Sequence, residues 1–576
     1  MNSNENLATD LKNILGTKSK VTLITGAAAA GKTKLTLDLY NYFSSKAVGS
    51  AAIITPNSQT RSRILNLLKN GSQNKVLLSP KVFTLTSFFS KLFSATDIQA
   101  KQISNFDKYL HIEKIIKNLN QSGRIAACNK IVDKPGLISS LVKSIAEIKR
   151  LGISPEQLIE TFSDNISKYS DLVLVYSEYQ RYLRENNLYD SEGQDWLVKL
   201  FLDNTPKLSD SFLKQAGLCG VVSILFDGFT DFSSTQLDII KLLSTSISQT
   251  FITLPTSQDD RKTLWSWSNK TRLKIKNKFK NFLSEVSLNP RKKNTIINKI
   301  FSDSQSKSDL SNVTIVSASG QAGEVRSAAL QIKKILLNPE TSSDTVGIIA
   351  RNLDDYFPII ENLFRQAKIP VRKNVIKLSQ VPVIKFIVKI IKLHTMKFDH
   401  NAFIDIINSS YFSPSISDDK NNKTIFDAIA FIRKNNLTNL YDKKNINKHK
   451  SDEIDFINTT LDLIAELKTA DDLMQSKLFK SLYQTVLNND DPEQVSLDIK
   501  ALNQLNSLLE NYIDEPALNV VKNLNTISIT RSAAIGAVDV NSVIDSKNIR
   551  WDHTIILGVS EGQFPAKLNQ GIFLLI

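Results

Sequence analysis

Short apolar runs and stretches of helical spacing take turns along the chain of 576 residues. Runs at residues 21–25, 51–55 and 82–85 each pass directly into a helical pattern, and a further buried-strand pattern covers residues 221–226. A strand that repeatedly runs into a helix is typical of a parallel sheet covered by helices. The pattern therefore predicts a protein of the α/β class.

Two longer regions, at about residues 100–205 and 375–525, have a helical pattern throughout. A second α/β unit is expected to begin with a strand at residues 313–316, to continue with a strand at 346–350, and to resume at residues 526–557. A chain of this length is too long for one hydrophobic core. The sequence therefore predicts several domains.

The strand at residues 21–25 leads into the motif Gly-x-x-x-x-Gly-Lys-Thr. Its glycines let the backbone curl so that N–H groups face phosphate oxygens, and the next helix points its positive N-terminus at them. The lysine would reach the β- and γ-phosphates, and the threonine would ligate Mg²⁺. We predict a site for ATP and Mg²⁺; the alternative is an ordinary glycine-containing βα turn. Its residues are Gly26, Ala27, Ala28, Ala29, Ala30, Gly31, Lys32 and Thr33.

A second motif, Asp-Gly-Phe-Thr-Asp at residues 227–231, follows the strand at 221–226. An acidic residue at the end of a hydrophobic strand is where a phosphate-loop enzyme holds its Mg²⁺. Asp227 is therefore predicted to be a Mg²⁺ ligand through the nucleotide. The alternative is a turn or helix-capping aspartate, because Asp before Gly is also common in turns.

These motifs resemble those of UvrD-like superfamily 1 helicases and, more closely, those of the AddB-type subunit of the RecBCD-like AddAB helicase–nucleases. The resemblance rests on the glycine-rich motif, on residues 227–232 followed by Gln236, and on residues 551–565. It implies two P-loop NTPase (RecA-like) motor domains with parallel sheets, each interrupted by a helical insertion domain. The boundaries expected for the first motor domain are 1–100 and 206–300, for its insertion 101–205, for the incomplete second motor domain 310–374 and 525–576, and for its insertion 375–524.

The chain departs from active UvrD-like motors at the second motif. Those motors carry Asp-Glu-x-Gln-Asp there, with the glutamate activating water, whereas this chain has Gly228 in its place. Loss of a general base lowers a rate by a factor on the order of a hundred to ten thousand. The resemblance also implies that the arginine after the strand at 346–350 faces the γ-phosphate. Arg351 is the candidate; the alternative is an exposed arginine at a strand end.

The resemblance also indicates which motifs and domains of the family are not found in this sequence. The basic, histidine-containing motif that couples DNA to ATP is absent before residue 552. The chain stops at Ile576, before the last helicase arginine motif and before the nuclease domain with its cysteine-bound iron–sulfur cluster. We therefore expect a truncated or interrupted reading frame, or a split gene, and no iron–sulfur cluster in this chain.

Two further segments have competing interpretations. Trp265 and Trp267 precede a basic run that ends at Lys280, which is the composition of a single-strand DNA track; a basic linker between the motor domains is favoured. Glu147 and Lys149 have the Glu-x-Lys spacing of a nuclease motif, but the helical pattern around them favours a solvated helix face.

The composition of the chain indicates a kind of binding partner and excludes some classes of protein. A net charge of +15 suits DNA, although it could also be an ordinary basic surface. Two distant cysteines and five scattered histidines predict neither a disulfide framework nor a metal cluster. Apolar stretches are too short to span a bilayer, and the polar N-terminus argues against a secretory signal. We expect no membrane contact and a cytoplasmic protein.

These features predict an ATP- and DNA-binding subunit of a double-strand-break repair helicase–exonuclease, acting in recombinational repair. It should bind double-stranded DNA ends and single-stranded DNA, form a heterodimer with an AddA-type subunit, and serve as a scaffold or strand-recognition subunit with weak or no motor activity. The alternative is an autonomous DNA-dependent ATPase and helicase of the UvrD-like class. A third class is a phosphate-loop regulator or kinase that does not bind DNA; the paired α/β units argue against it.

Overall fold

The computed structural model divides the chain into two compact units, Met1–Ala367 with Asn541–Ile576, and Lys368–Val540. It describes residues 11–564 apart from 13, 18, 28–29, 72–78, 162–165, 206, 257–261, 289–311, 340, 373–374, 394–397, 413–420, 436, 438–439, 441–451, 523, 525–526, 531–535 and 548. Each unit is described by itself.

A six-stranded sheet of order β3-β2-β6-β7-β1-β8 forms the centre of the first unit. All its neighbouring strands pair in parallel, as the alternation of strands and helices predicts. The strands are β1 (Val21–Gly26), β2 (Ala51–Thr55), β3 (Val82–Thr84), β6 (Ser223–Phe226), β7 (Gln249–Pro255) and β8 (Leu283–Ser287).

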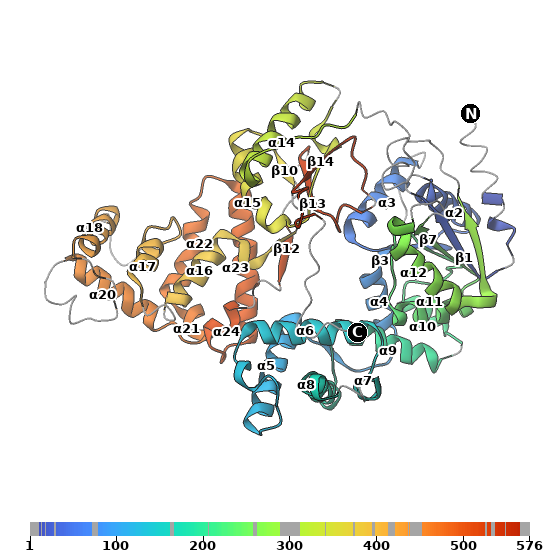
Figure 1. Ribbon diagram of the computed structural model, residues 1–576, viewed down its shortest axis with the longest axis horizontal. Coiled ribbons are helices and arrows are strands. Elements are labelled where there is room, and N and C mark those ends of the chain that lie inside the picture. Colours follow the sequence, from blue (N-terminus) through green and yellow to red (C-terminus); the bar gives the residue numbers. More distant parts are fainter. Residues whose placement is uncertain are drawn as a thin grey trace. The chain divides into compact units, whose positions relative to one another are not determined.

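Helices cover both faces of this sheet (Figure 1). One face packs against α2 (Lys32–Lys46) and α3 (Ser58–Gly71). The other face packs against α4 (Leu85–Ser94), α9 (Ser191–Asp203), α10 (Asp210–Gln215), α11 (Ser234–Ser246) and α12 (Lys262–Phe279). Burial on both faces explains why the inner strands β2 and β6 are mostly apolar rather than alternating.

The helical region between β3 and β6 has its own core. That core is formed mainly by α5 (Asn105–Gln121), α6 (Pro135–Arg150), α7 (Pro155–Thr161) and α8 (Ile166–Glu185). The strands β4 (Lys101–Gln102) and β5 (Leu188–Tyr189) pair in parallel at its two ends. The prediction of a helical region here is confirmed.

A second strand pair in the first unit contains the strands predicted near residues 346–350 and 551–557. The strands β9 (Val346–Ala350) and β14 (His553–Leu557) pair in parallel, with α14 (Gly320–Leu336) and α15 (Leu353–Gln366) packed against them. Parallel pairing of strands that are far apart in sequence is what an α/β fold requires. A parallel α/β fold is therefore confirmed.

The strand predicted at residues 313–316 is wrong. These residues lie outside every described sheet, and the side chain of Ile315 is 91% exposed. The apolar pattern is local, but a strand also needs a neighbour for its N–H and C=O groups, and none of the described strands pairs with this segment.

The second unit is mainly helical, as predicted for residues 375–525. Its core lies among α16 (Pro382–Leu393), α17 (His400–Ile407), α18 (Asn421–Lys434), α20 (Asp452–Ala465), α21 (Ala470–Gln475), α22 (Lys477–Leu487), α23 (Pro492–Asn511) and α24 (Ala517–Lys522).

Short strand pairs accompany these helices. The strands β10 (Val371–Arg372) and β13 (Val538–Ser542) pair in parallel, and β11 (Val375–Lys377) pairs with β12 (Ser528–Thr530) in the antiparallel direction.

Candidate functional site

The glycine-rich motif lies between β1 and α2, as its sequence predicts. Gly31 precedes α2 with a φ of +94°, in the left-handed region that favours glycine, and no described side chain caps this helix. The first N–H groups of α2 are therefore available to an anion. A Cβ atom on Gly26 would lie 3.0 Å from the Cβ of Ala30 and 3.1 Å from the carbonyl oxygen of Leu288. Ala28 and Ala29 lie outside the described residues.

Lys32 folds back onto this loop. Its Nζ donates hydrogen bonds to the carbonyl oxygens of Gly26 at 2.7 Å and Ala27 at 2.8 Å. Burial lowers the pKa of Lys32 to about 8, although the nearby Asp227 carboxylate opposes that shift. The ammonium group thus lies among backbone dipoles, which suits a position that receives a negatively charged group.

Asp227 follows β6 and is 2% exposed. Its Oδ2 accepts a hydrogen bond from Thr33 at 2.9 Å. Its Oδ1 accepts from Thr253 on β7 at 2.8 Å and from Thr36 at 3.3 Å. The structure thus brings together the two predicted Mg²⁺ ligands, Thr33 and Asp227. Thr36 and Thr253 were not predicted.

A hydroxyl and a carboxylate are hard oxygen donors of the kind that Mg²⁺ prefers, and Mg²⁺ usually takes its remaining ligands from water and phosphate. Among the described residues, no group of three or more His, Cys, Asp or Glu side chains could hold a metal ion alone. The donor set of Thr33 and Asp227 therefore fits a cation that arrives with a nucleotide.

Gly228 carries no side chain at the position of the catalytic glutamate of active motors, and its φ is +86°. Its N–H donates to the hydroxyl of Thr253 at 3.3 Å. The next acidic residue, Asp231, accepts a hydrogen bond from Thr271 at 2.8 Å and lies 3.7 Å from the ammonium of Lys274. Both partners are on α12, so the described contacts direct the Asp231 carboxylate toward that helix.

Arg351 follows β9 and is exposed. Its guanidinium donates to the carbonyl oxygen of Gln563 at 3.1 Å. Gly558 and Gly562, in the turn after β14, have φ values of +70° and +79°, in the left-handed region that favours glycine. The role of Arg351 toward a nucleotide stays a prediction.

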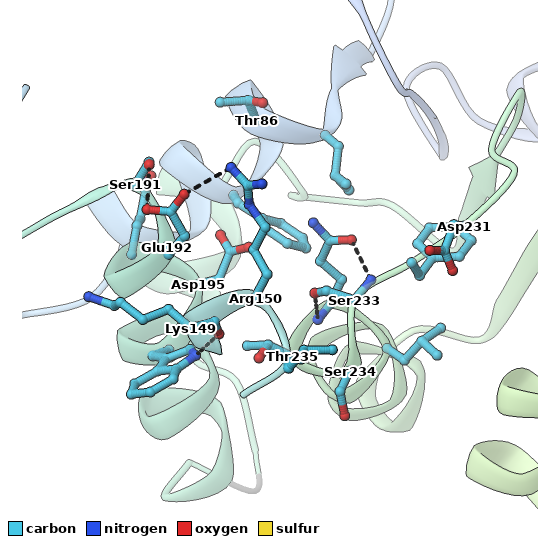
Figure 2. Close-up of a pocket in the computed structure, with 18 of the residues that line it drawn as sticks. Thr86, Lys149, Arg150, Ser191, Glu192, Asp195, Asp231, Ser233, Ser234 and Thr235 are labelled. Carbon is cyan, nitrogen blue, oxygen red and sulfur yellow. Dashed lines mark hydrogen bonds and ion pairs between the residues drawn. The ribbon is translucent and has the colours of Figure 1, made fainter. Parts of the chain in front are cut away.

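A cavity of about 1060 Å³ is lined mainly by the helices α4, α6, α9, α11 and α12 (Figure 2). Phe89, Trp196, Phe232 and Trp267 line it, and the Trp267 side chain is 61% exposed. Its polar lining includes Glu147, Arg150, Glu192, Asp195, Asp231, Lys274 and Lys278. The cavity thus combines aromatic rings with many hydrogen-bonding groups, as ligand sites commonly do.

The cationic groups of the cavity are already paired. Arg150 donates to Glu192 at 3.0 Å, Lys274 lies near Asp231, and Lys278 pairs with Asp238. Asp195 differs, because burial and the nearby Glu192 carboxylate raise its pKa to about 7, against a usual value of 3.8. Gln236 opposes that shift by hydrogen bonding to it, and Arg150 opposes it by its charge.

The interpretation of Lys149 as part of a solvated helix face is wrong. Its side chain is 1% exposed, and its Nζ lies 2.5 Å from Asp190 and 3.0 Å from Gln180. Burial would raise the pKa of Asp190, but Lys149 and Lys108 lower it to about 2. Glu147 is exposed, as expected. The ion pair holds α6 to α9 and explains how a lysine is buried here.

The interpretation of the basic segment as an interdomain linker is also wrong. Residues 262–279 form α12, which packs against the sheet and leads into β8, the partner of β1. Trp265 is buried and Trp267 is exposed toward the cavity. Arg272 and Lys276 both pair with Glu285 on β8.

The fold and the site define an α/β protein with a glycine-rich strand-to-helix loop at the carboxyl edge of a parallel sheet. Residues 23–306 match the family model described as ADDB, N-terminal, so this part of the chain is similar to the AddB family. None of the described helices is long and apolar enough to cross a membrane.

Curated relatives agree with this family. Proteins named as ATP-dependent helicase/deoxyribonuclease subunits are 23% identical over 60% of the chain in Listeria innocua and 24% identical over 60% in Clostridioides difficile. Another in Carboxydothermus hydrogenoformans is 33% identical over 26% of the chain. These alignments cover 31%, 31% and 13% of the relatives. The chain thus matches less than a third of each relative's length.

Proposed function

We propose that the chain is an ATP-binding, DNA-binding subunit of a double-strand-break repair helicase–exonuclease, and that it contributes weak or no motor activity of its own. The observation that carries this proposal is the combination of Lys32, Thr33 and Asp227 at one sheet edge with Gly228 beside them. The first three supply what binding needs, whereas Gly228 cannot activate water.

Nucleotide binding would use the backbone N–H groups of the loop and of the first turn of α2. Lys32 would exchange its two carbonyl partners for phosphate oxygens, because a charge-assisted hydrogen bond is stronger than a neutral one. Thr33 and Asp227 would hold Mg²⁺, and Arg351 is a candidate contact for the γ-phosphate. We propose that these residues belong to two RecA-like domains, each of which carries a helical insertion.

DNA binding is supported by the net charge of +15 and by the cavity beside α12. Because the cationic groups of the cavity are paired internally, its contribution would come chiefly from stacking of bases on Trp267 and from neutral hydrogen bonds. We propose single-stranded DNA as its occupant and double-stranded ends as the entry substrate. The phosphate contacts of the basic surface would make this binding salt-dependent.

The partner is proposed from the names of the relatives, which describe one subunit of an ATP-dependent helicase/deoxyribonuclease. A second, AddA-type subunit would supply the motor, and this chain would act as a scaffold that holds or recognises the emerging strand. The sites described above include no nuclease centre, so nuclease activity is not proposed for this chain.

ATP hydrolysis by the purified chain, measured with and without single-stranded DNA, tests the proposal. We expect fluorescent ATP analogues to bind while turnover stays near background, and Lys32→Ala to abolish binding. Lys46→Ala, at the opposite end of α2, is the control for loss of a lysine. DNA-stimulated turnover that Lys32→Ala abolishes would contradict the scaffold role and favour an autonomous motor of the UvrD-like class.

A further inference from the structure

The hydroxyl of Thr253 lies at the centre of the contacts that fix Asp227. Thr253 is on β7, is 3% exposed, and donates to Oδ1 of Asp227 at 2.8 Å. The hydroxyl oxygen of Thr253 also accepts a hydrogen bond from the N–H of Gly228 at 3.3 Å. One hydroxyl therefore holds both the carboxylate of Asp227 and the peptide group that follows it.

This arrangement distinguishes the two carboxylate oxygens of Asp227. Oδ1 accepts from Thr253 and Thr36, and the Thr36 hydroxyl also lies 3.2 Å from the carbonyl oxygen of Lys32. Because the hydroxyl of Thr36 is shared, Thr253 is the better donor to Oδ1. Oδ2 accepts from Thr33 at 2.9 Å, and Thr33 is a proposed Mg²⁺ ligand. The carboxylate is thus held by one oxygen and open to exchange at the other.

We infer that Thr253 is a positioning residue of the nucleotide site, whose hydroxyl turns Oδ2 of Asp227 toward Thr33 and the cation. The inference rests on the proposed binding of ATP with Mg²⁺. Partners that orient a metal-binding carboxylate are worth about ten- to a hundredfold in metal affinity. Thr253 should therefore act on the Mg²⁺-dependent part of nucleotide affinity and not on the part that the loop and Lys32 provide.

The test measures binding of a fluorescent ATP analogue, mant-ATP, to the full chain in a series of MgCl₂ concentrations and in excess EDTA. Three variants are compared: Thr253→Val, which keeps the shape and removes the hydroxyl; Thr253→Ser, which keeps the hydroxyl; and Thr250→Val, a buried control three residues earlier on β7. Thermal unfolding of each variant shows that it is folded at the assay temperature.

We expect Thr253→Val to raise the half-saturating Mg²⁺ concentration about tenfold, to change affinity in EDTA less than about twofold, and Thr253→Ser to behave like wild type. Equal losses with and without Mg²⁺, or no change in either, would overturn the role of Thr253 while leaving nucleotide binding intact. Failure of the wild-type chain to bind mant-ATP would instead overturn the proposed nucleotide site and, with it, this inference. If Thr253→Val is unfolded, Thr253→Ala replaces it as the variant without the hydroxyl. Its Mg²⁺ dependence of mant-ATP binding is then compared with that of Thr253→Ser.

Discussion

The glycine-rich loop after β1 and the cavity around Asp195 belong to the same unit of the chain, yet they hold their charges differently. At the loop, Lys32 is held by backbone carbonyls and Asp227 by threonine hydroxyls, all of which are neutral partners. In the cavity, Arg150 and Lys278 are each paired with a carboxylate of the protein. Asp195 is the group there that approaches neutrality near physiological pH.

This difference indicates which kind of ligand each region can bind. A ligand that brings its own charges, such as a nucleotide with Mg²⁺, can replace neutral partners without leaving a buried charge unpaired. A charged ligand in the cavity would first have to break ion pairs. The cavity therefore suits groups that stack and form neutral hydrogen bonds, such as nucleobases. The predictions below test this contrast, beginning with the largest expected effect.

Removal of the exposed tryptophan should weaken DNA binding most. Trp267→Ala is expected to lower affinity for a labelled single-stranded oligonucleotide about tenfold, because one aromatic stacking contact is worth about 1–3 kcal/mol. Leu273→Ala removes an exposed apolar side chain from the same helix and is the matched control. Fluorescence anisotropy measures both. Similar losses in the two variants would mean that α12 acts through its fold and not through stacking.

A glutamate at position 228 should not restore the motor. Gly228→Glu is expected to lower the free energy of unfolding by about 1–2 kcal/mol, because a residue with a Cβ is strained at a φ of +86°. Gly228→Ala carries the same backbone strain without the carboxylate and is the control. Urea unfolding and DNA-stimulated ATP turnover are the measurements. Turnover that appears in Gly228→Glu alone would show that the site lacks only its base.

The sequence predicted the parts of this picture that depend on local pattern. The strand β1 before the loop, α2 after it, and Asp227 directly after β6 follow from runs of neighbouring residues. Thr253 could not be found in this way, because it lies 26 residues from Asp227 and meets it only through the pairing of β6 with β7. The burial of Lys149 likewise depends on Asp190, 41 residues away. Periodicity identifies a helix, but it does not identify the partner that lets a charge be buried.

Asp195 should make stability depend on pH. Its folded-state pKa of about 7 lies above the usual 3.8, so the folded chain binds more protons than the unfolded chain between these values. Its contribution to stability is therefore lost as the pH rises toward 7 and above. The free energy of unfolding of Asp195→Asn, taken relative to that of wild type, should rise from pH 5 to pH 8. The rise should be on the order of 1–2 kcal/mol. Urea unfolding at both pH values measures this.

The control for Asp195 is Asp203→Asn, an aspartate at the end of the same helix. Both variants replace an aspartate of α9 by its neutral amide, so a general effect of that replacement would appear in both. A pH-dependent difference confined to Asp195→Asn would confirm a carboxyl held near neutrality inside the cavity. Equal pH dependence in both variants would contradict it.

Binding of a nucleotide should raise the fraction of Lys32 that is protonated. With a pKa of about 8 in the free loop, it is about half protonated at pH 8, and phosphate oxygens would favour the charged form. Binding of mant-ATP at pH 8 should therefore take up about half a proton, measured by calorimetry in two buffers of different ionisation enthalpy. Lys32→Arg keeps a permanent charge and should bind without uptake. Proton uptake that persists in Lys32→Arg would have to arise at another group. It would contradict the view that a nucleotide replaces the neutral partners of Lys32 at the loop.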